Sequence, residues 1–319
     1  MFNLVDEKKE IALTILRYVC DLPVSEVVRY PNGYCHSVYF AQAGAEKYVL
    51  RVTNESEKQY YMGALQWLPQ LENLGIPAPK IVKNGRYEDV YFCLITFIPG
   101  DDIGNIYDSL SKSQKRNIAR DIAEIQKKVA LLPTGHFYGY TADEVPYSTW
   151  ADFLNSQIQR SQERLAQNGV WGTDICDILK AQMNDLQHYL STVRPTAFLG
   201  DITTKNVLVQ NGKLSGIVDV DEICYGDSLL VVGLTHMALL AAEADTDYTA
   251  YWLEEMNPGA EKRKAVELYT LLFCVDFMSE QGMRFGNGNS VPVNPKTIAV
   301  LNRSFARLCQ IGQKKQTNY

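Results

Sequence analysis

The prevailing spacing of hydrophobic residues changes from strand-like to helical close to residue 98. In the first part, short runs of β-branched and aromatic residues alternate with Gly, Pro and Asn, which is typical of strands joined by turns. Apolar residues at helical spacing also predict a helix over 7–20 and another over 56–74. Strands are predicted over 24–30, 37–41, 48–53, 81–82 and 90–97, with Asn84-Gly85 as the turn before the last strand.

After Pro99-Gly100 the apolar residues recur with the period of a helix. Positions 118, 122, 125 and 129 give a clear 3.6-residue repeat, and Ser111 can cap the helix that contains them. We therefore predict an α+β protein with a small β-rich lobe, residues 1–97, and a larger, mainly helical lobe, residues 98–319. The predicted helices of the second lobe are 111–131, 148–167, 174–192, 229–256, 260–285 and 295–313.

The segment 196–227 interrupts these helices with a predicted β-hairpin. Two runs of strand composition, Asn206–Gln210 and Lys213–Val220, flank Asn211-Gly212. An Asn-Gly pair between such runs is a strong hairpin signal, because both central residues of a type I′ turn need positive φ. The chain is therefore expected to reverse at Asn211-Gly212.

The predicted register of this hairpin brings polar side chains together. Asn206 is expected to face Ile217, which places Asp219 beside Asn206 at the open end, and Asp201 lies on a short loop just before it. This layout suits phosphoryl transfer, with Asp201 orienting an attacking hydroxyl while Asn206 and Asp219 hold Mg²⁺ on nucleotide phosphates. An acid in a buried strand, as predicted for Asp219, is costly without such a partner. As a loop residue, Asp201 also fits a simple turn cap.

Four motifs in this segment together resemble the active-site segment of the aminoglycoside phosphotransferase and choline kinase-like family. They are Leu199-Gly200-Asp201, Asn206, Ile217-Val218-Asp219 and Tyr225-Gly226-Asp227. The resemblance covers about residues 28–285 and implies a two-lobed protein-kinase-like fold. It also implies a kinase that moves the γ-phosphate of Mg-ATP or Mg-GTP to a hydroxyl of an aminoglycoside, an amino-sugar or an alcohol.

The chain departs from the family pattern at several supporting positions. Leu199 stands where the family has His, Ser228 where it has Pro, and Val231 where it has an acid. Gln126 replaces a His that often closes the helix predicted over 111–131, whereas Asp227 matches a turn with a structural role. We predict that apolar packing supports the loop instead. The same changes leave open a non-catalytic nucleotide-binding or structural relative.

The resemblance further implies phosphate contacts in the first lobe. By the resemblance Gly33 is expected in the loop that covers the phosphates, whereas the loop taken alone favours a plain β-turn. Arg51 stands at the strand position, more often Lys, that contacts the α and β phosphates. Its expected partner is Glu57, with Glu55 as the second candidate, although the family position itself aligns near Tyr61.

The base and acceptor sites are less defined by the sequence. By resemblance, Ile95 is expected behind the base, with the backbone from Thr96 to Ile98 bonding its edge, which does not distinguish ATP from GTP. Asp221 and Glu222 are candidates for the acceptor pocket or a second metal contact, and an ordinary acidic turn explains them as well. A choline or ethanolamine kinase remains an alternative, since Tyr248, Tyr251 and Trp252 suit either an aromatic cage or a core.

Composition narrows the classes of partner. The 319 residues carry 37 acidic and 31 basic side chains, a net charge of −6, which argues against nucleic acid and is compatible with a small cationic substrate. Seven widely spaced cysteines without a C-x-x-C pair predict reduced thiols and neither disulfides nor zinc. The chain shows no signal peptide and no apolar run that would span a membrane, so we expect a cytoplasmic protein.

Two questions stay open at this stage. The sequence does not indicate an oligomeric state. A hydrolase that uses Asp201 and Asp219 as acid and base is a third reading, and activity without any nucleotide would be its signature.

Overall fold

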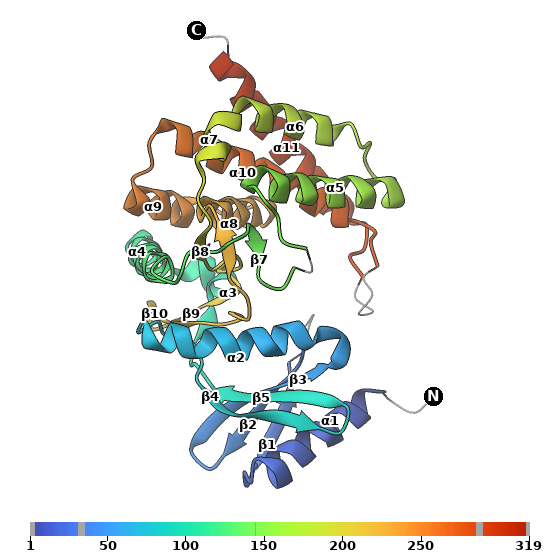
Figure 1. Cartoon of the computed structure of the whole chain (residues 1–319), viewed down its shortest axis with the longest axis vertical. Helices are drawn as coiled ribbons and strands as arrows, with labels where there is room; N and C mark the ends of the chain where they lie inside the picture. The colour runs from blue at the N-terminus through green and yellow to red at the C-terminus, as the bar shows by residue number, and fades with distance from the viewer. Residues whose placement is uncertain (1–3, 31–35, 144, 285–289, 317–319) are drawn as a thin grey trace.

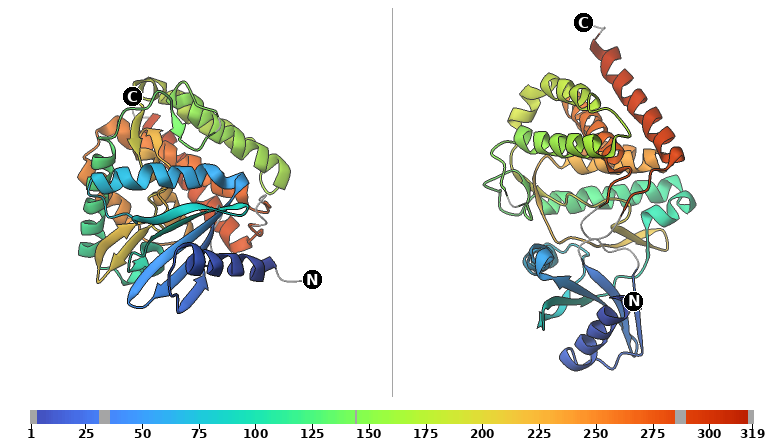
Figure 2. Two further views of the ribbon diagram at one scale, coloured as in Figure 1. Left: turned by 60° about the horizontal axis from the view of Figure 1, so that its bottom comes forward. Right: turned by 90° about the vertical axis from the view of Figure 1, so that its right-hand side faces the viewer.

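Two parts of different composition follow each other in the computed structural model, which describes residues 4–30, 36–143, 145–284 and 290–316 (Figure 1). The first part is built on a five-stranded antiparallel sheet, and the second is mainly helical. Helix α2 belongs to the first part and lies on the side of its sheet that faces the helical part (Figures 1 and 2). The predicted α+β architecture, with a β-rich N-lobe and a helical C-lobe, is confirmed.

The sheet of the N-lobe has the strand order β1-β2-β3-β5-β4. Alternation along the strands gives it two apolar faces. On β5, Phe92 and Leu94 belong to the cluster that packs on α1, whereas Cys93 and Ile95 belong to the cluster that contains α2. The elements are α1 (Leu4–Thr14), β1 (Glu26–Arg29), β2 (Ser37–Ala43), β3 (Glu46–Asn54), α2 (Lys58–Asn73), β4 (Ile81–Tyr87) and β5 (Val90–Thr96).

The turn between β4 and β5 lies later than the sequence indicates. Asn84 and Gly85 are inside β4 and pair with Cys93 and Phe92. The Asn84 side chain accepts a hydrogen bond from Tyr61 on α2, at 3.2 Å, which favours its place in the strand. The chain reverses instead after Tyr87, where Glu88 has a positive φ of 49°.

Two of the predicted C-lobe helices are each divided in two. The span 174–192 is interrupted at Leu186, and the span 229–256 is interrupted between residues 242 and 246, where Glu243 has a φ of 55°. No helix within the described residues is both long and apolar enough to cross a membrane. The helices are α3 (Ile103–Ile106), α4 (Lys112–Val129), α5 (Trp150–Asn168), α6 (Ile175–Asp185), α7 (Gln187–Thr192), α8 (Leu229–Ala241), α9 (Asp247–Met256), α10 (Ala260–Glu280) and α11 (Pro295–Gln316).

Four short strands lie within the segment 196–227, and two earlier strands of the C-lobe pair with them. They form two small sheets, in the orders β10-β9-β6 and β7-β11-β8. The strands are β6 (Asp101–Asp102), β7 (Gly139–Tyr140), β8 (Thr196–Phe198), β9 (Val207–Gln210), β10 (Lys213–Ile217) and β11 (Cys224–Gly226).

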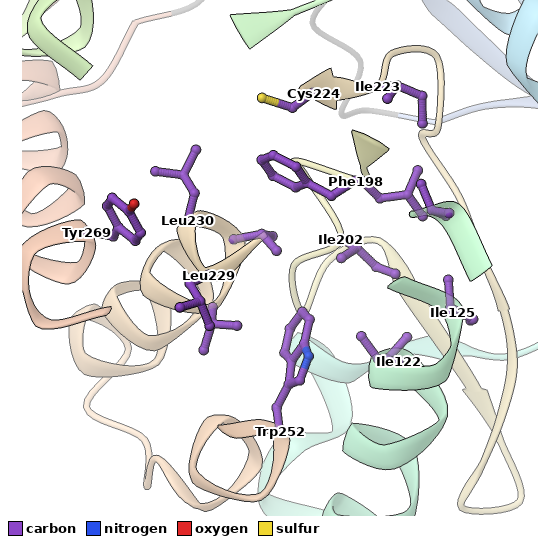
Figure 3. Close-up of a cluster of buried hydrophobic side chains, with 14 of the residues drawn as sticks. Ile122, Ile125, Phe198, Ile202, Ile223, Cys224, Leu229, Leu230, Trp252 and Tyr269 are labelled. Carbon is purple, nitrogen blue, oxygen red and sulfur yellow. The ribbon is translucent and has the colours of Figure 1, made fainter. Parts of the chain in front are cut away.

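The core of the C-lobe surrounds the loop that contains Asp201. Phe198 and Ile202, which flank this loop, lie among side chains of α4 and α8 such as Ile122 and Leu229 (Figure 3). Both are 2% exposed or less. Burial of such side chains stabilises by about 1.5–3 kcal/mol each, so the polar residues between them are held by apolar anchors on both sides.

Gly63 lets α2 approach the C-lobe closely. A Cβ placed on Gly63 would overlap the backbone carbonyl of Asp221, which follows β10. Any larger residue would therefore push α2 and this loop apart.

We predict that Gly63→Ala lowers the free energy of unfolding by about 1–3 kcal/mol, because the added methyl group meets backbone that cannot rotate away. Urea unfolding measures this change. Gln66→Ala, at an exposed position of the same helix, is the control. Equal stability of the two variants would contradict the contact between α2 and the loop.

Candidate active site

The predicted hairpin is present, but its register differs by one residue. Asn211 and Gly212 have φ values of 53° and 71°, as a type I′ turn requires. A bulge between Leu214 and Gly216 then shifts the pairing, so Ile217 faces Val207 rather than Asn206. The extra residue of the bulge thus corrects the predicted pair of Asn206 with Ile217.

The shifted register still brings Asp201, Asn206 and Asp219 together. Asn206 accepts a hydrogen bond from the backbone N–H of Val218 at 2.9 Å, next to Asp219. Its side-chain amide donates to the backbone oxygen of Asp201 at 2.8 Å and to Oδ2 of Asp201 at 3.0 Å. Asn206 therefore fixes both the backbone and the carboxylate of Asp201.

Asp219 follows β10 rather than lying within it. Its φ is 59°, a left-handed conformation that costs about 1–2 kcal/mol for a residue other than Gly. Its side chain is 57% exposed, so the predicted burial of an acid in a strand is wrong. The bend leaves the carboxylate open to a ligand, directly after Val218, whose N–H is bonded to the backbone of Asn206.

Asn206 and Asp219 offer oxygen atoms of the kind that Mg²⁺ prefers. Asn206 presents its amide hydrogens to two acceptors of Asp201, so its Oδ1 is the atom left for another partner. Asp219 adds a carboxylate. No cluster of three or more His, Cys, Asp or Glu able to hold a metal occurs within the described residues. Such a small set fits Mg²⁺, which usually takes one or two protein oxygens together with phosphates and water.

The surroundings of the two aspartates favour their protonated forms. Burial and the nearby charge of Asp219 raise the pKa of Asp201 to about 7, while the hydrogen bond from Asn206 opposes this shift. Desolvation by the surrounding protein also raises the pKa of Asp219, although its side chain is partly exposed, and the charge of Arg51 opposes this shift. Two carboxylates held this close favour a cation between them.

Gln126 holds the residue that replaces the family His. Its Nε2 donates to the carbonyl of Leu199 at 2.9 Å, and its Oε1 accepts from the N–H of Leu199 at 3.0 Å. Both side chains are buried. The loop is thus supported by a side-chain amide as well as by the predicted apolar packing of Leu199, and the sequence did not indicate the amide contact.

The remaining departures lie in the core. Val231 is fully buried on α8, and Ser228 precedes that helix. Asp227 accepts hydrogen bonds from Tyr189 at 2.6 Å and from Tyr269 at 2.9 Å. These contacts tie the end of β11 to α7 and α10.

Arg51 does not pair with either predicted glutamate. Its guanidinium binds both carboxylate oxygens of Asp221, and Nη2 lies 3.4 Å from Oδ1 of Asp219. Glu55 instead accepts from Tyr91 at 2.8 Å, and Glu57 makes no hydrogen bond or ion pair within the described part of the chain. The proposed Glu57 partner is corrected because Asp221 reaches Arg51 from the C-lobe.

Asp221 is therefore not placed to line an acceptor pocket. It is 5% exposed, and Oδ2 also lies 2.9 Å from Nε2 of His36. Arg51 and His36 hold the pKa of Asp221 below its ordinary value, although burial acts in the opposite direction. Glu222 is more accessible, and burial together with the charges of Asp143 and Asp201 raises its pKa to about 8.

The proposed base contacts lie at the end of β5. Ile95 is buried on the face toward α2. The N–H groups of Thr96 and Phe97 already donate to the carbonyls of Lys80 and Lys47, at 2.9 and 3.3 Å, whereas the N–H of Ile98 makes no backbone hydrogen bond of this kind within the described residues. Gly33 lies outside the described residues.

The aromatic residues of α9 do not form an open cage. Tyr248 and Trp252 are fully buried, and Trp252 lies in the core shown in Figure 3. Tyr251 packs on the guanidinium of Arg116 at 4.0 Å. Core packing, the second of the two predicted explanations, accounts for these residues.

This geometry agrees with the comparison to known families. The model of the phosphotransferase enzyme family, APH, matches residues 26–261. The chain belongs to this family. None of the curated proteins compared with it matches.

Solved structures share the fold of this APH family member at low sequence identity. One is a thermostable mutant of aminoglycoside phosphotransferase APH(4)-Ia with AMP-PNP and hygromycin B, with a TM-score of 0.64, 17% identity and coverage of 94% of this chain and 99% of that one. Another is APH(2″)-IIa with streptomycin and ATP, with a TM-score of 0.63, 16% identity and coverage of 97% of both chains.

A putative fructosamine-3-kinase from Haemophilus somnus 129PT is also similar. Its TM-score is 0.64, its identity is 12%, and the match covers 92% of this chain and 95% of that one. The predicted two-lobed, protein-kinase-like fold is therefore confirmed.

We predict that Gln126→Leu strands the buried N–H and C=O of Leu199, at a cost of about 1–3 kcal/mol for each group. Urea unfolding measures the loss. Gln70→Leu removes a similar side-chain bond to a backbone carbonyl, at 3.1 Å on the exposed face of α2, and is expected to change stability little. A loss no larger than that of the control would show that Gln126 does not support the loop.

We also predict that Glu222→Gln becomes increasingly stable relative to wild type as the pH rises. The raised pKa means that the folded protein keeps a proton on Glu222 that the unfolded chain has released, so wild-type stability falls between the unfolded value near 4.5 and about pH 8. Melting temperatures at pH 5 and pH 9 measure the difference. A constant offset between the two proteins would contradict the raised pKa.

Proposed function

We propose that this APH family member transfers the γ-phosphate of ATP or GTP, bound with Mg²⁺, to a hydroxyl of a small cationic molecule. The observation that carries the proposal is the juxtaposition of Asp201, Asn206 and Asp219, in which an exposed carboxylate is fixed by the amide beside a second carboxylate. These residue types and this arrangement suit phosphoryl transfer.

Each residue has a separate task in this proposal. Asp201 accepts the hydrogen of the acceptor hydroxyl and aims its oxygen, and Asn206 keeps the carboxylate in place. Asn206 Oδ1 and the Asp219 carboxylate hold Mg²⁺, which supplies positive charge to the phosphates when bound. A loose transition state leaves little covalent work for the protein, so positioning and electrostatics carry most of the rate.

The class of acceptor is inferred from Glu222, an acidic side chain close enough to Asp201 for the two charges to interact. Glu222 has a raised pKa because it is partly buried near other acids, and an ammonium group would favour its ionised form. The similar structures are consistent with this, because one is a complex with hygromycin B and the other a complex with streptomycin. Aminoglycosides, amino-sugars and amino-alcohols share a hydroxyl and an amine, which is the acceptor class that we propose.

The roles of the two aspartates separate in mutants. Asp201→Asn keeps the hydrogen bonds available to Asn206 but lowers the basicity of the group facing the hydroxyl, so transfer is expected to fall at least about 100-fold. Binding of Mg-ATP or Mg-GTP stays close to wild type. Asp219→Asn is expected to weaken Mg-nucleotide binding instead. Phosphate transfer to a panel of amino-sugars and amino-alcohols, with calorimetry of nucleotide binding, measures both effects.

A thermal-shift experiment tests the nucleotide site without knowledge of the acceptor. Mg-ATP or Mg-GTP at about 100 times its Kd should stabilise the wild type by about 2.7 kcal/mol, and EDTA should remove most of the shift. Asp89→Asn, on an exposed turn, is the control and should shift as wild type does. A stabilised protein without transfer to any acceptor would favour a non-catalytic nucleotide-binding relative, and turnover of Asp201→Asn at the wild-type rate would exclude its proposed role.

A further inference from the structure

A buried ion pair joins the sheet of the N-lobe to the loop after β10. Arg51 and Asp221 are 7% and 5% exposed, and two guanidinium nitrogens donate to the two carboxylate oxygens. A weaker contact of 3.4 Å joins Arg51 Nη2 to Asp219 Oδ1. One side chain of β3 thus contacts two acids of the loop, Asp219 and Asp221.

His36 closes the other side of this carboxylate. Its Nε2 lies 2.9 Å from Oδ2 of Asp221, and its Nδ1 lies 2.7 Å from Oγ1 of Thr53. Hydrogen on Nε2 satisfies the contact with Asp221, because the ring then donates to the carboxylate, and Nδ1 lies within hydrogen-bond distance of the Thr53 hydroxyl. The charges of Arg51 and Asp221 then cancel within the protein.

The loop is fixed on both sides of Asp219. On one side the N–H of Val218 donates to Asn206 at 2.9 Å. On the other side Asp221 is held through its side chain by Arg51 and through its backbone by the close approach of Gly63. Asp219 lies between these points in its left-handed conformation, so its direction depends on both.

We propose that Arg51, Asp221 and His36 form a positioning unit for Asp219, and that Arg51 is not primarily a phosphate contact. The inference rests on the proposed function for the role of Asp219 as a metal ligand. The charge of Arg51 is already opposed by a buried carboxylate, so a nucleotide gains little from it directly. The two-pronged pairing also explains Arg in place of Lys, because an ammonium lacks the planar fork that matches both oxygens.

A double-mutant cycle of Arg51→Met and Asp221→Asn tests this assignment. Affinity for ATP is measured by calorimetry in Mg²⁺ and in EDTA, so that the gain due to Mg²⁺ is separated from phosphate binding itself. Each single variant is expected to lose about 10- to 100-fold of this gain, the usual loss when a group behind a metal ligand is removed. The double variant is expected to lose no more than the larger single loss, and affinity in EDTA stays close to wild type.

The control cycle is Arg86→Met with Asp89→Asn, an exposed pair 3.8 Å apart on the neighbouring hairpin, which is expected to leave the Mg²⁺ gain unchanged. Loss of affinity in EDTA in Arg51→Met but not in Asp221→Asn would overturn the proposal in favour of a phosphate contact. Additive losses in Mg²⁺ would overturn it as well.

The wild type, Arg51→Met, Asp221→Asn and the double variant are also unfolded in urea without any ligand. This measurement keeps the inference separate from the proposed function. A wild type that binds ATP no better with Mg²⁺ than with EDTA would refute the metal site itself. Non-additive changes in unfolding would still support the lock between Arg51 and the loop, whereas additive changes would overturn it.

Discussion

The carboxylate of Asp221 is buried against the guanidinium of Arg51, which lies 170 residues earlier in the sequence. Burying an ionised group is costly unless another charge and hydrogen bonds replace the water that it loses, and Arg51 and His36 supply both. Such a pair adds little net stability compared with an apolar contact, but it excludes arrangements in which either charge would be buried alone. It therefore specifies one position of the β10–β11 loop against β3, and the absence of a side chain at Gly63 follows from the same close approach.

The loop that presents Asp201 depends on a different principle. Leu199 and Ile202 are each 2% exposed on the two sides of the exposed acid, so the core holds the loop at both ends. Gln126 supplies the backbone of Leu199 with a donor and an acceptor, much as a neighbouring strand would. The acid is therefore rigidly placed even though it faces solvent, which is the condition that catalysis by positioning requires.

Predictions that depend on neighbouring residues in the sequence are correct more often than predictions that depend on residues far apart in the sequence. The turn at Asn211-Gly212 is encoded by two adjacent residues and was predicted correctly. The predicted register is wrong because the bulge after Leu214 is indicated in the sequence only by Gly216, a single glycine inside a strand run. The turn predicted at Asn84-Gly85 is wrong because the partner of Asn84, Tyr61, lies on another element.

The polar contacts of the site were least visible in the sequence. Nothing local connects Arg51 with Asp221, and the bonds of Gln126 go to backbone atoms that every residue possesses. Side chains of suitable type could be named from the motifs, but their partners could be found only once the fold had brought distant segments together.

Two departures from the family pattern lie in contacts that support the site, those of Arg51 and of Leu199. Where the resemblance led us to expect a strand Lys with a helix Glu, the chain has Arg51 with Asp221, and the two are bonded. Where it led us to expect a loop His below a helix that ends in His, the chain has Leu199 and Gln126, and these are bonded too. In both contacts the buried polar groups are satisfied, so neither departure disturbs the loop that carries Asp201 or the loop that carries Asp219.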